Sequence, residues 1–376
     1  MSAIYIHVPF CKSKCSYCSF YSVDKSENIE PWAKAVISEA DIRKTYLTDK
    51  NVHSVYFGGG TPSYIPVVLI EEIMSFLGKK YSFNPGIECT IEANPDDISI
   101  EWLKKVKQAG FNRLSVGIQS FIDNELLLMN RRHNANQAID SVKKARSVGF
   151  ENVSIDLIYG IPGSSIKSWN ENLNKVLSLQ VDHISAYCLS VDEGTSFYTK
   201  LKDGSMELVD DELQIEQYRL LNQVLTDNGF CHYEISNFAK PGHKSLHNSS
   251  YWNQTQYLGL GPSAHSFNGF TRDWNCSNIS KYIEGIQNNS NFSQREELSI
   301  SDKLNDYILT SLRTKNGFDL QYSETNFGSQ YTKRLISKFD ACIQKGWMKD
   351  CYGFYVMTLD GWLLSDAILQ DLIFID

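Results

Sequence analysis

Residues 4–18 read IYIHVPFCKSKCSYC, an apolar segment that predicts a β-strand over residues 4–10, followed at once by Cys11, Cys15 and Cys18. Three thiolates on one short loop can each hold one iron of a 4Fe–4S cluster, which leaves the fourth iron open to a small molecule. Zinc is the main alternative, but its structural sites use cysteine pairs or Cys/His sets that fill four positions. Core packing alone rarely places three cysteines so close in sequence. The spacing therefore favours an iron–sulfur site.

Outward from this stretch, short apolar runs alternate with longer amphipathic segments up to about residue 200, as repeated βα units require. Strands that helices join and that are buried on both faces form a parallel sheet. Six units are too few for a closed eight-unit barrel, so we predict an α/β fold with a partial, open (βα)6 barrel. The predicted strands span residues 4–10, 54–57, 88–93, 113–118, 153–159 and 183–189, and the predicted helices residues 31–46, 67–80, 100–109, 134–148 and 168–179.

The pattern changes after the sixth predicted strand. One long amphipathic helix is expected over residues 207–228, and residues 229–275 form a loop-rich stretch with many aromatic and histidine residues. Helical periodicity then returns from about residue 299, with Ser301 as a candidate helix cap and a hairpin-like segment at 352–359. We therefore expect three parts, a partial barrel (1–205), a helix and loop region (206–290) and a small C-terminal helical, winged-helix-like module (291–376).

The composition of the chain indicates which classes of partner and which cellular compartment to expect. The chain has 376 residues, 42% of them hydrophobic, with a formal net charge of −8 and no lysine or arginine block, which argues against a nucleic-acid partner. The first residues contain no basic segment of a signal peptide, and no run of about 18 apolar residues occurs. The six cysteines outside the cluster motif lack the regular spacing of a disulfide framework. We expect a cytoplasmic protein.

A glycine-rich segment, Gly58-Gly59-Gly60-Thr61-Pro62, follows the second predicted strand and allows a ligand to approach the backbone closely. Alone it is more often a tight turn, but it shares the strand-end face with the cysteines. The two motifs together resemble radical S-adenosylmethionine (SAM) enzymes, a superfamily in which the open iron chelates SAM and a reduced cluster cleaves it to a 5′-deoxyadenosyl radical. This resemblance implies that Cys11, Cys15 and Cys18 ligate a 4Fe–4S cluster.

Further motifs resemble the branch of this superfamily that contains the anaerobic coproporphyrinogen dehydrogenases (HemN) and the heme-trafficking chaperones (HemW). They are YIHVPF (5–10), IEANP (91–95), SVGIQSF (115–121), DLIYG (156–160) and GLGPSAH (259–265). Carboxylates can accept hydrogen bonds from a ribose or an amine, and arginine can pair with a carboxylate, although a buried ion pair or a helix cap would explain each residue equally well. By resemblance the SAM site contains Tyr5, Tyr17, Gly59, Gly60, Thr61, Glu92, Gln119, Arg131, Asp156 and His265.

The segment His247-Asn248-Ser249-Ser250-Tyr251-Trp252 matches the H-N-x-x-Y-W motif of the heme-trafficking members. Neutral imidazole can ligate heme iron and aromatic rings can pack a flat macrocycle, so the resemblance implies a heme site at His247, Tyr251 and Trp252. The alternative is that these side chains only fix the loop to the barrel. Position 20 is Phe20, where dehydrogenases of the branch have a fourth cysteine, and their extension before the cysteines is absent here.

These features predict a heme chaperone that uses a SAM-liganded 4Fe–4S cluster and delivers heme to a respiratory or other acceptor protein. The expected partners are a membrane-associated acceptor, an electron donor and a second copy of the chain. The alternative is an oxygen-independent coproporphyrinogen III dehydrogenase, whose polyanionic substrate would need a denser group of basic residues than Arg131, Arg132 and Lys143-Lys144. A scaffold with a vestigial cluster is a third option. No residue is assigned a catalytic role, and enzymatic activity is left open.

Overall fold

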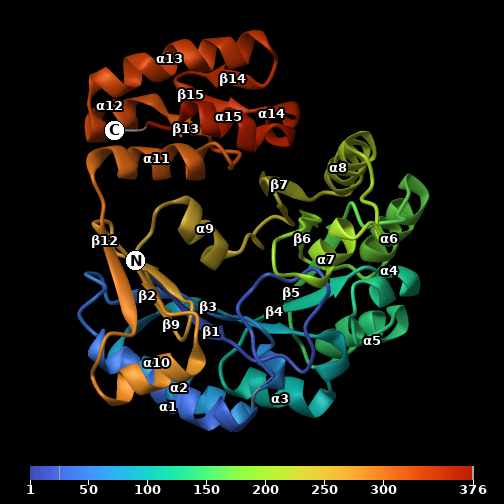
Figure 1. The fold of residues 1–376 in the computed structure, drawn as a ribbon, viewed down its shortest axis with the longest axis vertical. Coiled ribbons are helices and arrows are strands. Elements are labelled where there is room, and N and C mark those ends of the chain that lie inside the picture. Colours follow the sequence, from blue (N-terminus) through green and yellow to red (C-terminus); the bar gives the residue numbers. More distant parts are fainter. Residues whose placement is uncertain (25, 375–376) are drawn as a thin grey trace.

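The computed structural model describes residues 1–24 and 26–374. Its centre is a twelve-stranded sheet in the order β12-β11-β10-β9-β1-β2-β3-β4-β5-β6-β8-β7 (Figure 1). The strands β1 to β6 pair in parallel with their neighbours, so the predicted α/β fold with six parallel barrel strands is confirmed. These strands are β1 (Ser2–Val8), β2 (Asn51–Gly59), β3 (Ser82–Ala93), β4 (Arg113–Gln119), β5 (Asn152–Tyr159) and β6 (His183–Cys188).

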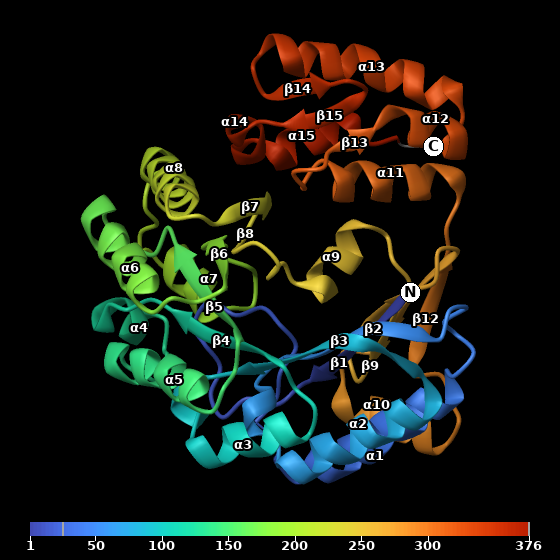
Figure 2. The ribbon, with the colours of Figure 1, turned by 180° about the vertical axis from the view of Figure 1, so that it is seen from behind.

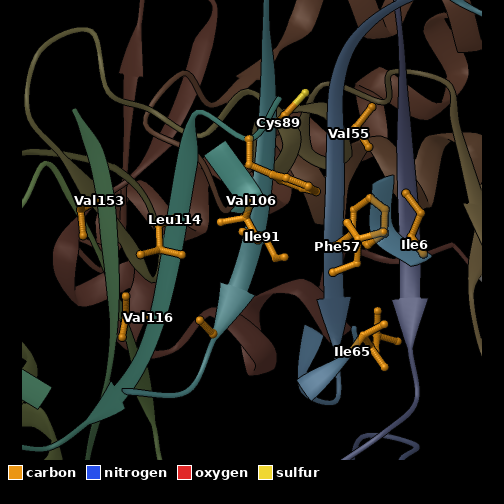
Figure 3. Close-up of a cluster of buried hydrophobic side chains, with 14 of the residues drawn as sticks. Ile6, Val55, Phe57, Ile65, Cys89, Ile91, Val106, Leu114, Val116 and Val153 are labelled. Carbon is orange, nitrogen blue, oxygen red and sulfur yellow. The ribbon is translucent and has the colours of Figure 1, made fainter. Parts of the chain in front are cut away.

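Helices cover the outer face of this sheet, whereas a short later helix, α9 (Leu246–Trp252), lies on its concave inner face (Figures 1 and 2). Alternation along each strand sends every second side chain outward into a hydrophobic core, as Val55 and Phe57 of β2 show in Figure 3. The intervening side chains face the inner space, which we call the lumen. The first helices are α1 (Ile29–Ile42), α2 (Val67–Lys80), α3 (Ile100–Gln108), α4 (Asp123–Leu128), α5 (Ala135–Ser147), α6 (Ile166–Ser178) and α7 (Ser196–Lys202).

The long helix expected over residues 207–228 is α8 (Asp211–Asp227), but the prediction of a loop-rich stretch after it was wrong. Short strands there extend both edges of the sheet, because β9 pairs in parallel with β1 and β8 pairs antiparallel with β6. Strands of three to five residues are too short to show alternation in the sequence. They are β7 (Cys231–Glu234), β8 (Asn237–Ala239), β9 (Tyr257–Leu260), β10 (His265–Phe267) and β11 (Thr271–Asn275), followed by α10 (Ile279–Gln287) and β12 (Ser293–Glu297).

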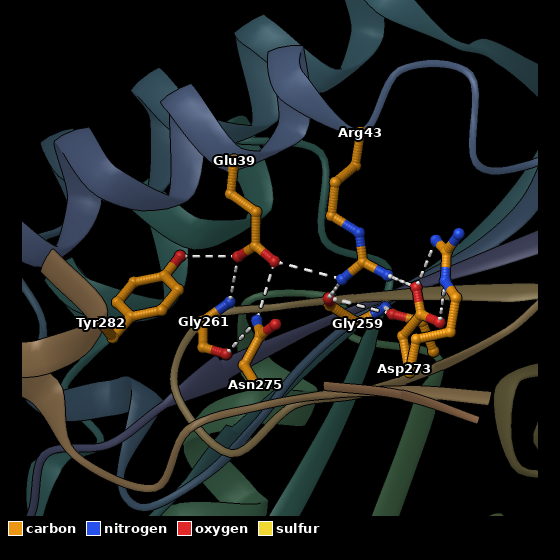
Figure 4. Close-up of polar contacts among 9 residues, drawn as sticks. Glu39, Arg43, Gly259, Gly261, Asp273, Asn275 and Tyr282 are labelled. Carbon is orange, nitrogen blue, oxygen red and sulfur yellow. Dashed lines mark hydrogen bonds and ion pairs between the residues drawn. The ribbon is translucent and has the colours of Figure 1, made fainter. Parts of the chain in front are cut away.

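A buried polar network fastens the added strands to the barrel (Figure 4). The fully buried carboxylate of Glu39 on α1 accepts hydrogen bonds from the hydroxyl of Tyr282 (2.6 Å) and the side-chain amide of Asn275 (2.7 Å). Arg43, directly after the last residue of α1, pairs with Glu39 (3.2 Å) and with Asp273 of β11 (3.0 Å). Because each charge is paired and hydrogen-bonded, burial is tolerated and β11 is held in register against α1.

The C-terminal part builds its own hydrophobic core around Leu304, Phe318 and Phe339. Ser299, not Ser301, caps its first helix, because the Ser299 hydroxyl accepts the backbone N–H of Asp302 and the Asp302 carboxylate accepts the N–H of Ser299. Among the described residues no helix is long and apolar enough to cross a membrane. The elements are α11 (Ile300–Ser311), β13 (Phe318–Asp319), α12 (Leu320–Phe327), α13 (Ser329–Gln344), β14 (Met348–Cys351), β15 (Phe354–Met357), α14 (Leu359–Leu363) and α15 (Ser365–Leu372).

Candidate functional site

The cysteine loop is held at the carboxyl end of β1 by backbone hydrogen bonds at both of its ends. The N–H of Val23 donates to the carbonyl of Pro9 (2.7 Å), and the N–H of Cys11 donates to the carbonyl of Val23 (3.0 Å). In the middle of the loop, the side-chain amide of Asn130 donates to the carbonyl of Lys14 (2.9 Å). The three cysteines are therefore presented on a loop whose backbone is fixed before any ligand binds.

Donors surround the cysteine sulfurs. The hydroxyl of Thr61 donates to Sγ of Cys11 (3.3 Å), and a guanidinium N–H of Arg131 donates to Sγ of Cys15 (3.2 Å). Such donors stabilise a thiolate, the form that ligates metal, although burial raises the pKa of the free Cys11 and Cys18 thiols. In the described part of the chain, no three His, Cys, Asp or Glu side chains are grouped so as to hold one metal ion. In a cubane cluster each cysteine ligates a separate iron.

A pocket of about 540 Å³ opens beside these thiols at the carboxyl ends of the strands, where α/β barrels place their ligands. A pocket of this size suits a ligand as large as SAM. Most of the predicted SAM residues line it, but Tyr5 and His265 lie outside the lining residues. The predicted residues in the lining are Cys11, Cys15, Tyr17, Cys18, Gly59, Gly60, Thr61, Glu92, Gln119, Arg131 and Asp156.

In the glycine-rich segment, a side chain on Gly59 or Gly60 would collide with neighbouring atoms of the protein. A Cβ on Gly60 would lie 2.8 Å from the carbonyl oxygens of Val8 and Phe10, which are backbone atoms and cannot rotate away. Gly59 has a φ of +105°, and a Cβ there would lie 2.5 Å from the ring of His7. Glycine is therefore required at both positions, and their backbone forms one wall of the pocket.

Two half-buried carboxyl groups, Glu92 of β3 and Asp156 of β5, line the same pocket. Glu92 accepts the hydroxyl of Tyr56 (2.7 Å) and the backbone N–H of Gly59 (3.2 Å). Burial, together with the nearby Asp156, raises the pKa of Glu92 to about 7, and burial raises the pKa of Asp156 to about 6. Both groups can exchange hydrogen bonds with hydroxyl or amine groups of a ligand close to neutral pH.

The opposite wall is shaped by β4. Gln119 has a φ of +69°, an uncommon conformation for a residue with a side chain, at the point where the pairing with β5 shifts register. Arg131 donates to Asn94 Oδ1 (2.7 Å) and to the carbonyl of Gly117, in addition to the sulfur of Cys15. Arg131 therefore links the cysteine loop to two strand ends of the barrel.

The histidine of the H-N-x-x-Y-W segment lies on α9 inside the lumen, not at the surface. His247 is 2% exposed, and its ring stacks on Tyr56 of β2 with centroids 4.9 Å apart. Its Nδ1 is 3.1 Å from Ser54 Oγ, and its Nε2 is 3.0 Å from the hydroxyl of Tyr251. Burial lowers its pKa to about 3, so the imidazole is neutral at physiological pH.

Of the other predicted residues, Tyr251 and Trp252 lie half-buried on the same helix, and Tyr5 stands between the two regions. The ring of Tyr5 lies 6.2 Å from Tyr56 and 6.1 Å from His247. His265 is exposed on β10, with its ring 6.3 Å from that of Trp274. The structure thus brings the cysteines together with all the predicted SAM residues except Tyr5 and His265, and places the H-N-x-x-Y-W segment outside the pocket lining.

Sequence reasoning missed several residues of this region. Tyr187 near the end of β6 and Asp192 after it line the pocket, with Tyr187 44% exposed. Glu88 on β3 binds the first turn of α9, because it accepts hydrogen bonds from the N–H groups of Leu246 (2.9 Å) and His247 (3.0 Å). The available signal for Glu88 and Tyr187 was their position in predicted strands, since alternate strand positions face the lumen of a partial barrel.

Comparison with known proteins places this arrangement in a family. Residues 5–176 match the Radical SAM superfamily. The chain is 33% identical to heme chaperone HemW of Bacillus subtilis over 98% of both chains, and 31% identical to HemW of Mycobacterium tuberculosis over 98% of this chain and 94% of that relative. The chain belongs to the HemW family.

The fold is shared more widely than the HemW family. The structure of coproporphyrinogen III oxidase (HemN) from Escherichia coli superimposes with a TM-score of 0.85 at 23% identity, covering 99% of this chain and 90% of that one. This similarity confirms the predicted fold. Membership of the radical SAM superfamily implies a 4Fe–4S cluster and SAM as the cofactors of this HemW-family chain.

Proposed function

We propose that this chain is a heme chaperone that binds a 4Fe–4S cluster, SAM and heme, and that passes the heme to an acceptor protein. The observation that carries the proposal is the position of His247, a neutral histidine on α9 that stacks on Tyr56, whose hydroxyl binds Glu92 of the cofactor pocket. The relatives that match over nearly the full length are named heme chaperones. A radical SAM pocket and a candidate heme ligand therefore share one lumen.

In this proposal Cys11, Cys15 and Cys18 hold the cluster, and the backbone of Gly59 and Gly60 approaches SAM. When bound, the cluster and SAM supply one-electron chemistry. Arg131 holds the loop and offers a positive charge beside Cys15. The remaining polar contacts to SAM come from Tyr17, Thr61, Glu92, Gln119 and Asp156.

Heme ligation by His247 requires one ring nitrogen to give up its present partner. Nδ1 faces Ser54, which comes from the barrel, whereas Nε2 faces Tyr251, which lies one turn later on the same short helix. We propose that iron replaces the Tyr251 hydroxyl at Nε2, while Ser54 keeps the ring oriented through Nδ1. Tyr251 and Trp252 then pack against the macrocycle.

The proposal extends to partners and location. In this proposal the chain acts in the cytoplasm as a homodimer, one protein supplies electrons to the cluster, and a respiratory, membrane-associated protein accepts heme. We also propose that the barrel (1–205), the region with α9 (206–290) and the C-terminal module (291–376) are the functional divisions of the chain.

Titration with hemin, followed by absorbance, tests the heme assignment on anaerobically reconstituted protein. Wild type should bind about one hemin per chain, and His247→Ala should bind it far more weakly. His243→Ala is the matched control, because His243 is a half-buried histidine four residues earlier and outside α9. Equal weakening in both variants, or unchanged binding in His247→Ala, would remove His247 from the heme site.

A further inference from the structure

Arg113 of β4 is a buried guanidinium that lacks hydrogen-bond partners. Its side chain projects into the lumen, Arg113 is 1% exposed, and it makes no hydrogen bond to any described residue. The closest carboxylate oxygen is Oε2 of Glu88, 4.0 Å from Nε, which is beyond hydrogen-bonding distance. Arginine carries five N–H donors, and a buried charge without hydrogen bonds is costly. Arg113 is therefore ion-paired with Glu88 but not hydrogen-bonded, and a ligand that accepts its N–H groups would explain the free donors.

A second unpaired donor stands directly beside it. Thr90 of β3 is opposite Arg113 in the parallel register, is 0% exposed, and its hydroxyl has no partner among the described residues. The neighbours Ile91 and Leu114 point outward into the hydrophobic core, so Thr90 and Arg113 both face the lumen. Two adjacent strands therefore present a hydroxyl and a guanidinium at the same level.

The acidic groups nearby are already engaged with other donors. Glu88 accepts three hydrogen bonds from the start of α9, namely from the Ser245 hydroxyl and from the N–H groups of Leu246 and His247. Glu92 is bonded to Tyr56 and Gly59. These carboxylates reduce the positive charge around Arg113, but they leave its fork of donors free.

We propose that Arg113 and Thr90 bind a carboxylate of the incoming ligand, and that this carboxylate is one of the two acid side chains of heme. This inference rests on the proposed binding of heme through His247. A planar, singly charged carboxylate fits the guanidinium fork, and Glu88 and Glu92 repel it less than they would repel a doubly charged phosphate. Arg113 lies close enough to His247 for its charge to contribute, after burial and His53, to the low pKa of that imidazole. His247 would thus bind the heme iron and Arg113 a heme carboxylate within the same lumen.

The test compares hemin with hemin dimethyl ester, in which both acids are blocked, in the same detergent-containing buffer. Wild type should bind the ester about tenfold to a hundredfold more weakly, the loss expected for a charged hydrogen-bonded pair. Arg113→Gln should weaken hemin by the same factor and leave the ester unchanged, and Thr90→Val should show the same pattern by a smaller factor. Arg146→Gln, a paired arginine on α5, is the control.

Equal affinity of wild type for hemin and its ester would overturn the inference. Equal weakening of both ligands by Arg113→Gln would also overturn it, because that pattern means a structural role only. If Arg113→Gln does not fold, the inference is still tested by comparing hemin with its ester on wild type and on Thr90→Val. Failure of the proposed function looks different, because hemin binding would then be insensitive to His247→Ala.

Discussion

Tyr251→Phe should strengthen heme binding, although Tyr251 belongs to the heme motif. The variant removes the hydroxyl that lies 3.0 Å from Nε2 of His247, and keeps a ring whose edge contacts the imidazole at a centroid distance of 5.3 Å. Iron must break this hydrogen bond in the wild type, at a net cost of about 1 kcal/mol. The variant should therefore bind hemin about fivefold more tightly.

Titration of wild type and Tyr251→Phe with hemin, at several protein concentrations, measures this difference in affinity. Ser54→Ala is the comparison variant. Ser54 lies 3.1 Å from Nδ1, the nitrogen that we do not assign to iron, so its loss frees no ligand atom and loosens the ring. We expect Ser54→Ala to bind hemin with unchanged or lower affinity. If Tyr251→Phe weakens binding as strongly as His247→Ala, or if Ser54→Ala is the tighter variant, the assignment of Nε2 is wrong.

Three further outcomes follow from the structure. Gly60→Ala should abolish SAM binding in equilibrium dialysis, because its Cβ would collide with backbone carbonyls, whereas Gly78→Ala on α2, with its closest atom at 3.6 Å, should bind normally. The triple cysteine-to-serine variant of the cluster loop should contain no iron after reconstitution, and unchanged iron content would exclude the cluster assignment. His232 has its folded pKa lowered to about 4 by burial, so its unfolded form takes up a proton first as the pH falls below 6.5. It should therefore contribute a loss of about 2.5 kcal/mol of stability between pH 8 and pH 4.5, and urea unfolding of His232→Gln should lack this part of the acid sensitivity.

The barrel was predictable because its strands are buried on both faces and because helices of ordinary length separate them. The start of β3 was not predictable, since residues 82–87 include Pro85 and Gly86 and do not resemble a strand interior. The short strands β7 to β11 were missed for a related reason, because β8 and β9, which join them to the barrel, pair with strands distant in sequence. Local pattern indicates a strand only where it is long enough to alternate.

The site residues likewise fall into a group that the sequence predicted and a group that only the structure revealed. The cysteines and glycines were found because their chemistry requires those residue types at fixed spacing. Arg113, Thr90 and Glu88 have no such spacing, and only the parallel register and the fold of α9 into the lumen bring them to His247. The burial of His247 likewise depends on Ser54, 193 residues away in the sequence. Tertiary contacts of this kind leave no local pattern.

The most direct test of the proposed heme-chaperone function uses one anaerobic, reconstituted preparation of the protein. One portion is mixed with hemin, and another with coproporphyrinogen III, SAM and a reductant. We predict that hemin binds stoichiometrically through His247 and that coproporphyrinogen III is recovered unchanged. Consumption of coproporphyrinogen III with release of methionine and 5′-deoxyadenosine, in protein that does not bind hemin, would contradict it and identify a dehydrogenase.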